Sequence, residues 1–203
     1  MEGHRAGLEK ASDAVLGFAE MGVSFITLFS FSTENWKRPK DEIAGILRLL
    51  AEAMERTAKE LDSRNIVIRH LGRLDRLATP LRKGVEHVVE KTRGNTGAVA
   101  SFAFDYGGRA EIVEAARKVV KAGLKADVLD EAAFEKNLHT AGLPDVDLLV
   151  RTGGEKRLSN FLLWQSAYAE LYFTDTLWPD FGRAEIDLAL AEYARRQRRF
   201  GGL

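Results

Sequence analysis

The stretch Val23-Ser24-Phe25-Ile26-Thr27-Leu28-Phe29-Ser30-Phe31 decides the fold. Its aromatic and branched residues are typical of a buried β-strand. Apolar residues recur with helical spacing before it, over residues 6–21, and after a polar loop, over residues 41–61. A buried strand between two amphipathic helices indicates an α/β architecture in which helices cover both faces of a sheet.

The same alternation continues along the chain. Further strands are predicted at 65–71, 98–104 and 146–150 and near 168–173, and further helices at 80–91, 108–121, 131–139 and 184–198. Strands that alternate with helices imply right-handed crossovers and parallel pairing. We therefore expect a single α/β domain over residues 1–203, with a mostly parallel central sheet flanked by helices.

Composition excludes several classes of protein. Lysine and arginine number 30, as do aspartate and glutamate, so the absence of net charge argues against a nucleic-acid partner. The lack of cysteine removes disulfides, thiolate nucleophiles and cysteine-based zinc sites. With no signal-peptide pattern and no apolar run of membrane-spanning length, we expect a cytoplasmic protein, while a peripheral membrane contact stays open.

Polar loops follow three of the predicted strands, at residues 32–39, 105–109 and 151–159. Ligands bind outside the carboxyl ends of strands in such sheets, so we expect the three loops to converge. The third loop combines arginines, the glycine pair Gly153-Gly154 and a serine. Guanidinium groups, backbone N–H groups freed by glycine and a hydroxyl suit a diphosphate. The alternative interpretation is an arginine-rich surface loop.

One carboxylate, Glu170, lies inside the apolar segment 167–173. Its burial without a partner would be costly, and a bound cation would supply that partner. The alternative is an acid that faces outward from the strand. Neither a Walker loop nor a complete dinucleotide fingerprint is present in the sequence, so ATP or NAD chemistry has no support.

Three segments resemble the signatures of the cis-prenyltransferases: Phe31-Ser32-Thr33-Glu34-Asn35-Trp36-Lys37-Arg38-Pro39, Asp105-Tyr106-Gly107-Gly108-Arg109, and residues 151–165. The resemblance runs from Gly3 to Gly202. It implies an enzyme that condenses isopentenyl diphosphate with an allylic diphosphate, usually farnesyl diphosphate. The implied product is a long cis-polyprenyl diphosphate such as undecaprenyl diphosphate. The resemblance also implies Mg2+ dependence, a homodimer and an apolar tunnel for the growing chain.

The resemblance also implies roles for individual residues. Asn35 matches a residue assigned to proton abstraction or its positioning, and we favour positioning because a neutral amide is a poor base. The isopentenyl diphosphate clamp is matched by Arg151, Arg157 and Ser159. Other substrate contacts are matched by His4, Ser32, Thr33, Glu34, Trp36, Arg38 and Leu158. Glu170 matches the family's Mg2+ carboxylate, and one acid suffices because Mg2+ binds one or two carboxylates together with phosphate oxygens.

Two further elements carry an implied role beside a simpler alternative. Arg199-Phe200-Gly201 resembles a motif that reaches across the dimer to the partner's diphosphate, and its alternative is a basic helix end favoured by the helix dipole. The helix predicted at 41–61 would form one wall of the tunnel. The alternative is that its apolar face belongs to the core.

The sequence departs from the family pattern in two places. A strand and the loop Asp-Gly-Asn-Gly-Arg-Trp-Ala, whose aspartate is the central acid, precede the Gly-His-Arg-Ala-Gly segment in the family. Here Met1-Glu2-Gly3 stands directly before His4. We therefore expect a domain that is N-terminally truncated relative to the family, through a misassigned start or a truncated reading frame. Asp105, where the family more often has asparagine, adds a negative charge near the site.

Two alternatives to an enzyme remain open at this point. One is a non-catalytic, diphosphate-binding partner subunit or a relic of the same family, although such a chain would be expected to lose the clamp residues as well. The other is a protein that binds nucleic acid or an anionic surface through Arg195, Arg196, Arg198 and Arg199. The absence of net charge weakens that second alternative.

Overall fold

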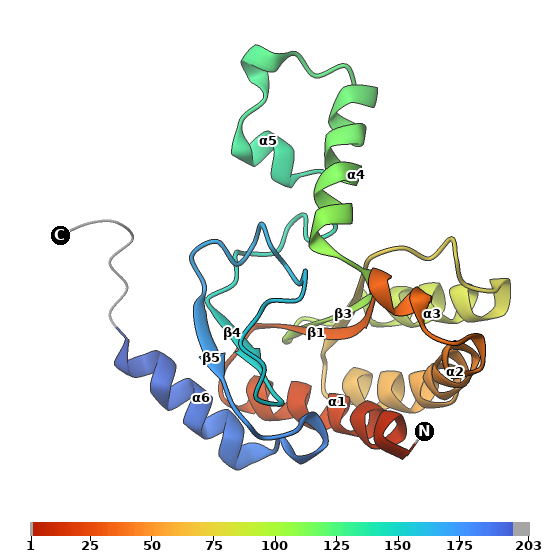
Figure 1. The fold of residues 1–203 in the computed structure, drawn as a ribbon, viewed down its shortest axis with the longest axis vertical. Helices are drawn as coiled ribbons and strands as arrows, with labels where there is room; N and C mark the ends of the chain where they lie inside the picture. Colours follow the sequence, from red (N-terminus) through yellow and green to blue (C-terminus); the bar gives the residue numbers. More distant parts are fainter. Residues whose placement is uncertain (1, 197–203) are drawn as a thin grey trace.

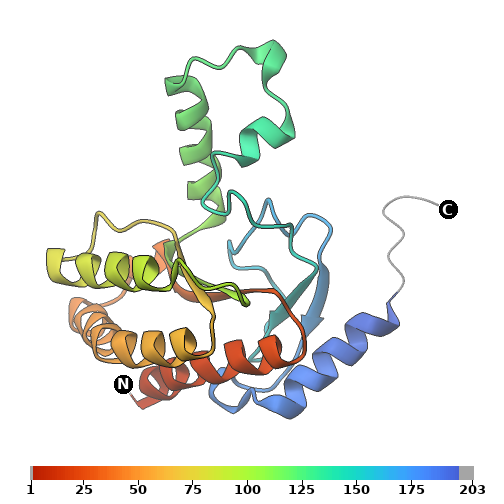
Figure 2. The same cartoon turned by 180° about the vertical axis from the view of Figure 1, so that it is seen from behind.

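The computed structural model describes residues 2–196, and the side chains of Glu2, His4 and Arg5 lie outside that description. Its helices surround the strands in one body, from which an arm projects (Figures 1 and 2). The arm contains α4 (Gly108–Lys121), the short 3-10 helix η2 (Ala126–Val128) and α5 (Glu131–Glu135). The alternation predicted from the sequence is confirmed.

The strands in the described part of the chain pair in parallel, in two sheets. The first sheet has the order β1 (Phe25–Ser32), β3 (Val99–Tyr106), β2 (Val67–Leu71), with Val99 opposite both Phe25 and Val67. The second sheet pairs β4 (Leu148–Arg151) with β5 (Glu170–Phe173). The predicted parallel arrangement is confirmed, but the strands do not form one continuous sheet.

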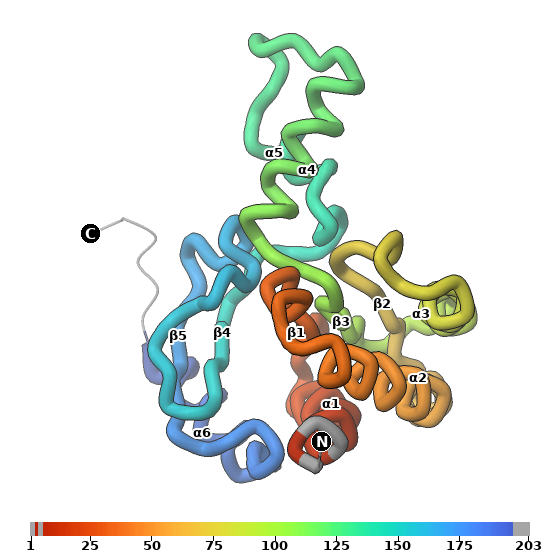
Figure 3. The backbone as a smooth tube through the Cα atoms, turned by 45° about the vertical axis from the view of Figure 1, so that its right-hand side comes forward, coloured from red at the N-terminus to blue at the C-terminus, as the bar shows by residue number. Residues whose placement is uncertain are grey.

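Helices cover the first sheet and form its main core. α1 (Glu2–Glu20), α2 (Lys40–Ser63) and α3 (Thr79–Thr92) pack against β1 and β2, as Figure 3 shows. The core between them is made of buried Val15, Ile26, Ala58, Leu61, Ile66, Ile68, Val88 and Ala100. The last helix, α6 (Arg183–Arg195), lies beside β5 and contacts α1. The apolar residues that recur with helical spacing in the sequence are thus buried against the sheet.

The apolar face of α2 belongs mainly to the core. Met54, Ala58 and Leu61 pack into the main core, and Ile46 and Leu50 pack with a second cluster around Phe31, Leu77 and Phe104. Ile46 and Leu50 also line the large cavity described below. The simpler interpretation of this helix is therefore confirmed for most of its length, and the apolar tunnel stays a prediction.

Several element boundaries differ from the sequence-based ones. The loop after β1 contains a 3-10 helix, η1 (Thr33–Lys37), because the Ser32 N–H donates to the Asn35 side-chain oxygen at 2.9 Å. The helix predicted at 131–139 ends at Glu135, where the backbone tightens into turns such as Asn137 N–H to Phe134 O. A further 3-10 helix, η3 (Trp178–Asp180), was not predicted.

A cavity of about 950 Å³ separates the two sheets. Every residue of 23–30, from β1 and the chain before it, lines it, and so does every residue of 143–152, from β4 and the chain before it. The face of a strand would contribute alternate residues only, so consecutive lining shows that the strand edges border the cavity. The α1 residues Gly7, Leu8 and Ala11 lie along the same cavity.

Candidate functional site

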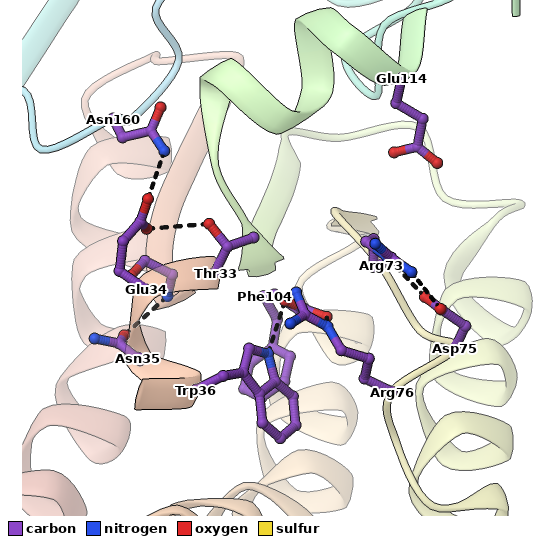
Figure 4. Close-up of polar contacts among 12 residues, drawn as sticks. Thr33, Glu34, Asn35, Trp36, Arg73, Asp75, Arg76, Phe104, Glu114 and Asn160 are labelled. Atoms are coloured by element: carbon purple, nitrogen blue, oxygen red, sulfur yellow. Dashed lines mark hydrogen bonds and ion pairs between the residues drawn. The ribbon is translucent and has the colours of Figure 1, made fainter. Parts of the chain in front are cut away.

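Three loops meet at the carboxyl ends of the strands, and Asn160 joins them. Its side-chain NH2 donates to the Glu34 carboxylate in η1 at 2.8 Å (Figure 4). Its side-chain oxygen accepts from Arg109 N–H at 2.8 Å. Its backbone oxygen accepts from Gly108 N–H at 2.7 Å. The predicted convergence of the loops is therefore confirmed. Asn160 was not among the predicted site residues, although it lies within the quoted motif.

The backbone is strained where these loops meet. Positive φ angles occur at Asp105 (50°), Ser159 (49°), Asn160 (65°) and Leu162 (42°). Such conformations cost energy in residues other than glycine, and they persist where the surrounding structure holds them, often at functional sites. Close packing requires a glycine at the nearby position 107, because a Cβ at Gly107 would lie 2.5 Å from the Thr33 hydroxyl oxygen.

Side chains of η1 are held from both ends of the helix. Ser32 ends β1, and Thr33 donates from its hydroxyl to the Glu34 carboxylate at 3.1 Å. Trp36 donates its indole N–H to the Asp105 carboxylate at 2.8 Å. Arg38, immediately after η1, pairs with Glu42 at 2.8 Å on the surface. The predicted substrate contacts Thr33, Glu34 and Trp36 thus lie in one short, anchored element, and Ser32 and Arg38 flank it.

The arginine segment, residues 151–159, borders the cavity. Arg151 ends β4, and Arg151, Arg157 and Leu158 line the cavity. Arg157 is also paired with Glu155, and both side chains are exposed. Two of the three predicted clamp residues, Arg151 and Arg157, thus lie at one cavity, whereas Ser159 does not line it. A guanidinium at this position can exchange a surface carboxylate for a phosphate.

The glycine pair does not offer the N–H groups that the sequence suggested. Gly153 N–H donates to Thr176 O and Gly154 N–H to Thr174 O, both at 2.9 Å. Positive φ angles of 82° and 76° let the two glycines make this turn. Because their N–H groups are bonded to the loop after β5, the expectation that they bind a diphosphate is wrong for this conformation.

Glu170 has a protein partner. Arg196 donates to its carboxylate at 2.8 Å and to Leu171 O at 3.0 Å. The carboxylate is partly buried, and Arg196 supplies the positive charge that we expected from a bound cation. In the parallel register Glu170 lies beside Leu148, so it sits at the end of β4 opposite to Arg151, about 10 Å away along the strand.

Two predicted site elements cannot be placed. The side chain of His4 and the segment Arg199-Phe200-Gly201 lie outside the described residues. Among the residues that are described, no cluster of three or more histidines, aspartates or glutamates is arranged to hold a metal ion. No helix in residues 2–196 is long and apolar enough to cross a membrane.

The link between Glu34 and Asn160 depends on pH. Burial acts to raise the pKa of the Glu34 carboxyl, but hydrogen bonds from its own backbone N–H, Asn160 and Thr33 outweigh it and hold the pKa below the ordinary 4.5. A carboxyl group whose pKa is lowered by folding stabilises the folded state at pH values above its ordinary pKa. This contribution is lost as the pH falls through the folded-state pKa. The link therefore weakens in acid.

Replacing Asn160 with glycine, which tolerates the positive φ, is expected to lower stability by about 1–2 kcal/mol near pH 7. This corresponds to a decrease of roughly 3–6 °C in Tm. The difference in Tm from the unmodified protein should narrow as the pH falls from 4.5 through the lowered folded-state pKa of Glu34, because the carboxyl then becomes protonated in the unmodified protein as well. A difference that stays constant across this range would contradict the role of Glu34.

Comparison with known proteins agrees with this geometry. Residues 1–201 match the family model described as putative undecaprenyl diphosphate synthase. The chain is 43% identical over 199 residues to an isoprenyl transferase of Neisseria gonorrhoeae, covering 98% of this chain and 79% of that protein. It is 44% identical over 205 residues to an isoprenyl transferase of Heliobacterium mobile, covering 99% and 79%.

Solved structures share the fold. A probable undecaprenyl diphosphate synthase from Campylobacter jejuni has a TM-score of 0.86 at 39% identity, over 97% of this chain and 92% of that one. Lavandulyl diphosphate synthase from Lavandula x intermedia, solved with dimethylallyl diphosphate, has a TM-score of 0.94 at 38% identity, over 98% and 88%. On the match of sequence, motifs and fold, the chain belongs to the undecaprenyl diphosphate synthase family, which are cis-prenyltransferases.

Proposed function

We propose that the protein elongates an allylic diphosphate, such as farnesyl diphosphate, with isopentenyl diphosphate to form a long cis-polyprenyl diphosphate. One observation carries the proposal: η1 and the arginine segment are joined by Asn160 at the carboxyl edge of the strands, and Arg151, Arg157 and Leu158 line a large, mostly apolar cavity. Cationic groups at the mouth suit the diphosphates, and the apolar walls suit an isoprenoid chain.

The proposed reaction breaks the allylic C–O bond and one C–H bond, and it forms one carbon–carbon bond. The C–O bond of the allylic diphosphate breaks, and the diphosphate leaves with the electron pair. A new carbon–carbon bond joins the allylic carbon to the terminal alkene carbon of isopentenyl diphosphate, which then loses a proton to restore a double bond. Arg151, Arg157 and Ser159 would hold isopentenyl diphosphate, and fixed positive charge would stabilise the diphosphates as charge develops.

In this proposal Asn35 positions the reacting groups and does not act as the base. Its side-chain oxygen already accepts the Ser32 N–H, which leaves the NH2 group to donate to a substrate oxygen. A released diphosphate or a water molecule would take the proton, because a neutral amide is a weak base.

Mg2+ is proposed as the cofactor, and it would neutralise diphosphate charge. Glu170 is its candidate ligand, and a single carboxylate fits a metal whose other ligands are phosphate oxygens and water. Because Arg196 holds that carboxylate at 2.8 Å, Arg196 would have to release it first. Replacing Arg196 with glutamine is therefore expected to tighten Mg2+ binding by the protein, measured by calorimetry in the presence of inorganic diphosphate.

A homodimer, a cytoplasmic location and a peripheral membrane contact for product release also belong to the proposal. Exposed apolar side chains support an interface along the arm: Val113, Val120, Leu124, Val128 and Leu129. Light scattering during size-exclusion chromatography will give the oligomeric state. A monomer at micromolar concentration would count against the dimer.

The domain is further proposed to be the truncated form expected from the sequence, in which the cavity between β1 and β4 takes one more strand. Support comes from the consecutive lining by both strand edges, because buried backbone N–H and C=O groups require partners. A strand paired on both sides would join the two sheets into one. If this chain is instead a non-catalytic diphosphate-binding subunit, the same cavity would remain without a further strand.

The test is incorporation of radiolabelled isopentenyl diphosphate with farnesyl diphosphate and Mg2+, by this chain and by a form extended upstream. Long polyprenyl product from either form is expected, with more product from the extended one. Lack of product from both forms would contradict the proposed reaction. Retained binding of isopentenyl diphosphate in that case would favour the non-catalytic subunit.

A further inference from the structure

Asp105 lies at the end of β3 with a fully buried side chain, 0% exposed. Its carboxylate accepts three hydrogen bonds. Arg76 donates from Nε at 2.8 Å and from Nη2 at 2.5 Å, and Trp36 donates from its indole nitrogen at 2.8 Å. A buried charge is stable only when it is paired and hydrogen-bonded, and here both conditions are met.

The same contacts enclose the indole ring of Trp36. The Arg76 guanidinium lies 5.2 Å from the ring centroid, within the range of a cation–π interaction. Phe31 meets the ring edge to face, with centroids 5.3 Å apart. Figure 4 shows Trp36 and Arg76 side by side below the end of β3. The ring is therefore held by a charge pair and a core aromatic residue, although it belongs to a surface loop.

Trp36 is the residue through which this contact reaches the proposed site. It follows Asn35 directly and precedes Arg38 by two residues, within or next to the single 3-10 turn of η1. A turn this short has few internal hydrogen bonds, so external contacts must fix its conformation. Asn160 holds it at Glu34, and Asp105 holds it at Trp36.

We propose that Asp105 is a positioning residue of the proposed reaction, which acts through Trp36 and uses Arg76 as its counterion to fix η1 against the end of β3. The inference rests on the proposed function. It also gives a structural reason for a carboxylate at position 105, which accepts from both Trp36 and Arg76. An asparagine could accept from Trp36, but its NH2 group would face the donors of Arg76.

The three tryptophans provide a direct test with internal controls. Each donates its indole N–H to a different acceptor: Trp36 to Asp105, Trp164 to Glu135 at 3.1 Å and Trp178 to Gly7 O at 2.8 Å. In Asp105→Asn, which tolerates the positive φ of 50°, the indole resonance of Trp36 is expected to shift in 1H–15N spectra while the other two stay in place. The matched control, Glu135→Gln, should shift only Trp164.

Hydrogen exchange measures the effect on η1. Amides of residues 33–38 are expected to exchange about tenfold faster in Asp105→Asn, because hydrogen bonds to a charged group are lost. The double variant Asp105→Asn with Arg76→Gln should restore most of the protection, since a glutamine oxygen can accept from the new amide. Unchanged exchange in Asp105→Asn, or an unmoved Trp36 resonance, would overturn the proposal.

Kinetics separate positioning from a purely structural role. In Asp105→Asn, kcat is expected to fall about tenfold while the KM for isopentenyl diphosphate changes less than about threefold, because Arg151 and Arg157 are untouched. An unchanged kcat with a loosened η1 would overturn the positioning role. Absence of turnover by both the unmodified chain and the extended form would count against the proposed function instead, whereas the spectra and exchange rates still decide how Trp36 is held.

Discussion

Replacing Arg157 with alanine is expected to raise the KM for isopentenyl diphosphate by about 100-fold, while the KM for farnesyl diphosphate changes less than about threefold. Arg157 lines the cavity beside Leu158, and its side chain is 60% exposed. A forked guanidinium–phosphate contact contributes about 2–3 kcal/mol, which corresponds to this change in affinity. Steady-state kinetics with each substrate varied in turn will measure the effect.

The fold should survive the Arg157 substitution. In the unliganded protein Arg157 pairs with Glu155 on the surface, and exposed ion pairs add little to stability. The matched control is Arg117→Ala, which removes an exposed charge from the middle of α4 and should change neither KM. Equal increases in both KM values for Arg157→Ala would contradict its assignment to the isopentenyl diphosphate clamp.

Replacing Glu111 with alanine is expected to destabilise the protein by about 4 kcal/mol, or roughly 8–16 °C in Tm. Glu111 is 2% exposed and accepts from the Tyr106 hydroxyl at 2.5 Å, Gln165 Nε2 at 3.1 Å and the His139 N–H at 2.8 Å. Burial and the carboxylate of Glu111 raise the pKa of the Tyr106 hydroxyl, which therefore remains a donor. Alanine would remove the acceptor of the buried Tyr106 hydroxyl and of the partly buried His139 N–H, and would leave Gln165 Nε2 with only the Thr140 hydroxyl as its acceptor.

Thermal unfolding followed by circular dichroism will measure this loss. Glu111→Gln keeps one side-chain acceptor and should lose less stability than the alanine variant. The control is Glu114→Ala on the same helix, whose carboxylate is 41% exposed and pairs with His139; it should cost less than about 1 kcal/mol. Similar losses in the Glu111 and Glu114 alanine variants would show that the buried network is not what holds the base of the arm.

Local pattern was enough to predict most of the elements and the meeting point of the loops. The apolar run at 23–31 became β1, shifted by a residue or two, and α4 has the bounds that its spacing predicted. Convergence of the loops follows from parallel pairing, because the carboxyl ends of parallel strands lie at one edge. Asn160 links the loops through hydrogen bonds to Glu34 and Arg109.

Partners far apart in the sequence could not be predicted. Glu170 was expected to need a cation, but Arg196 supplies the charge after the chain returns through α6. Similarly, the N–H groups of Gly153 and Gly154 bond to carbonyls of Thr176 and Thr174. The spacing of residues in the sequence predicts which side chains share a face of one helix or strand, but it does not predict which elements contact each other.

Strand order has a consequence for the timing of folding during synthesis. β1 pairs with β3 and not with β2, so Phe25 meets its partner Val99 only after roughly 70 more residues have been made. At about 5–20 residues per second, the ribosome takes some 4–14 s to produce them. Through that interval the edge of β1 that pairs with β3 stays open, and an exposed apolar strand edge is prone to aggregation and is the kind of segment that chaperones protect.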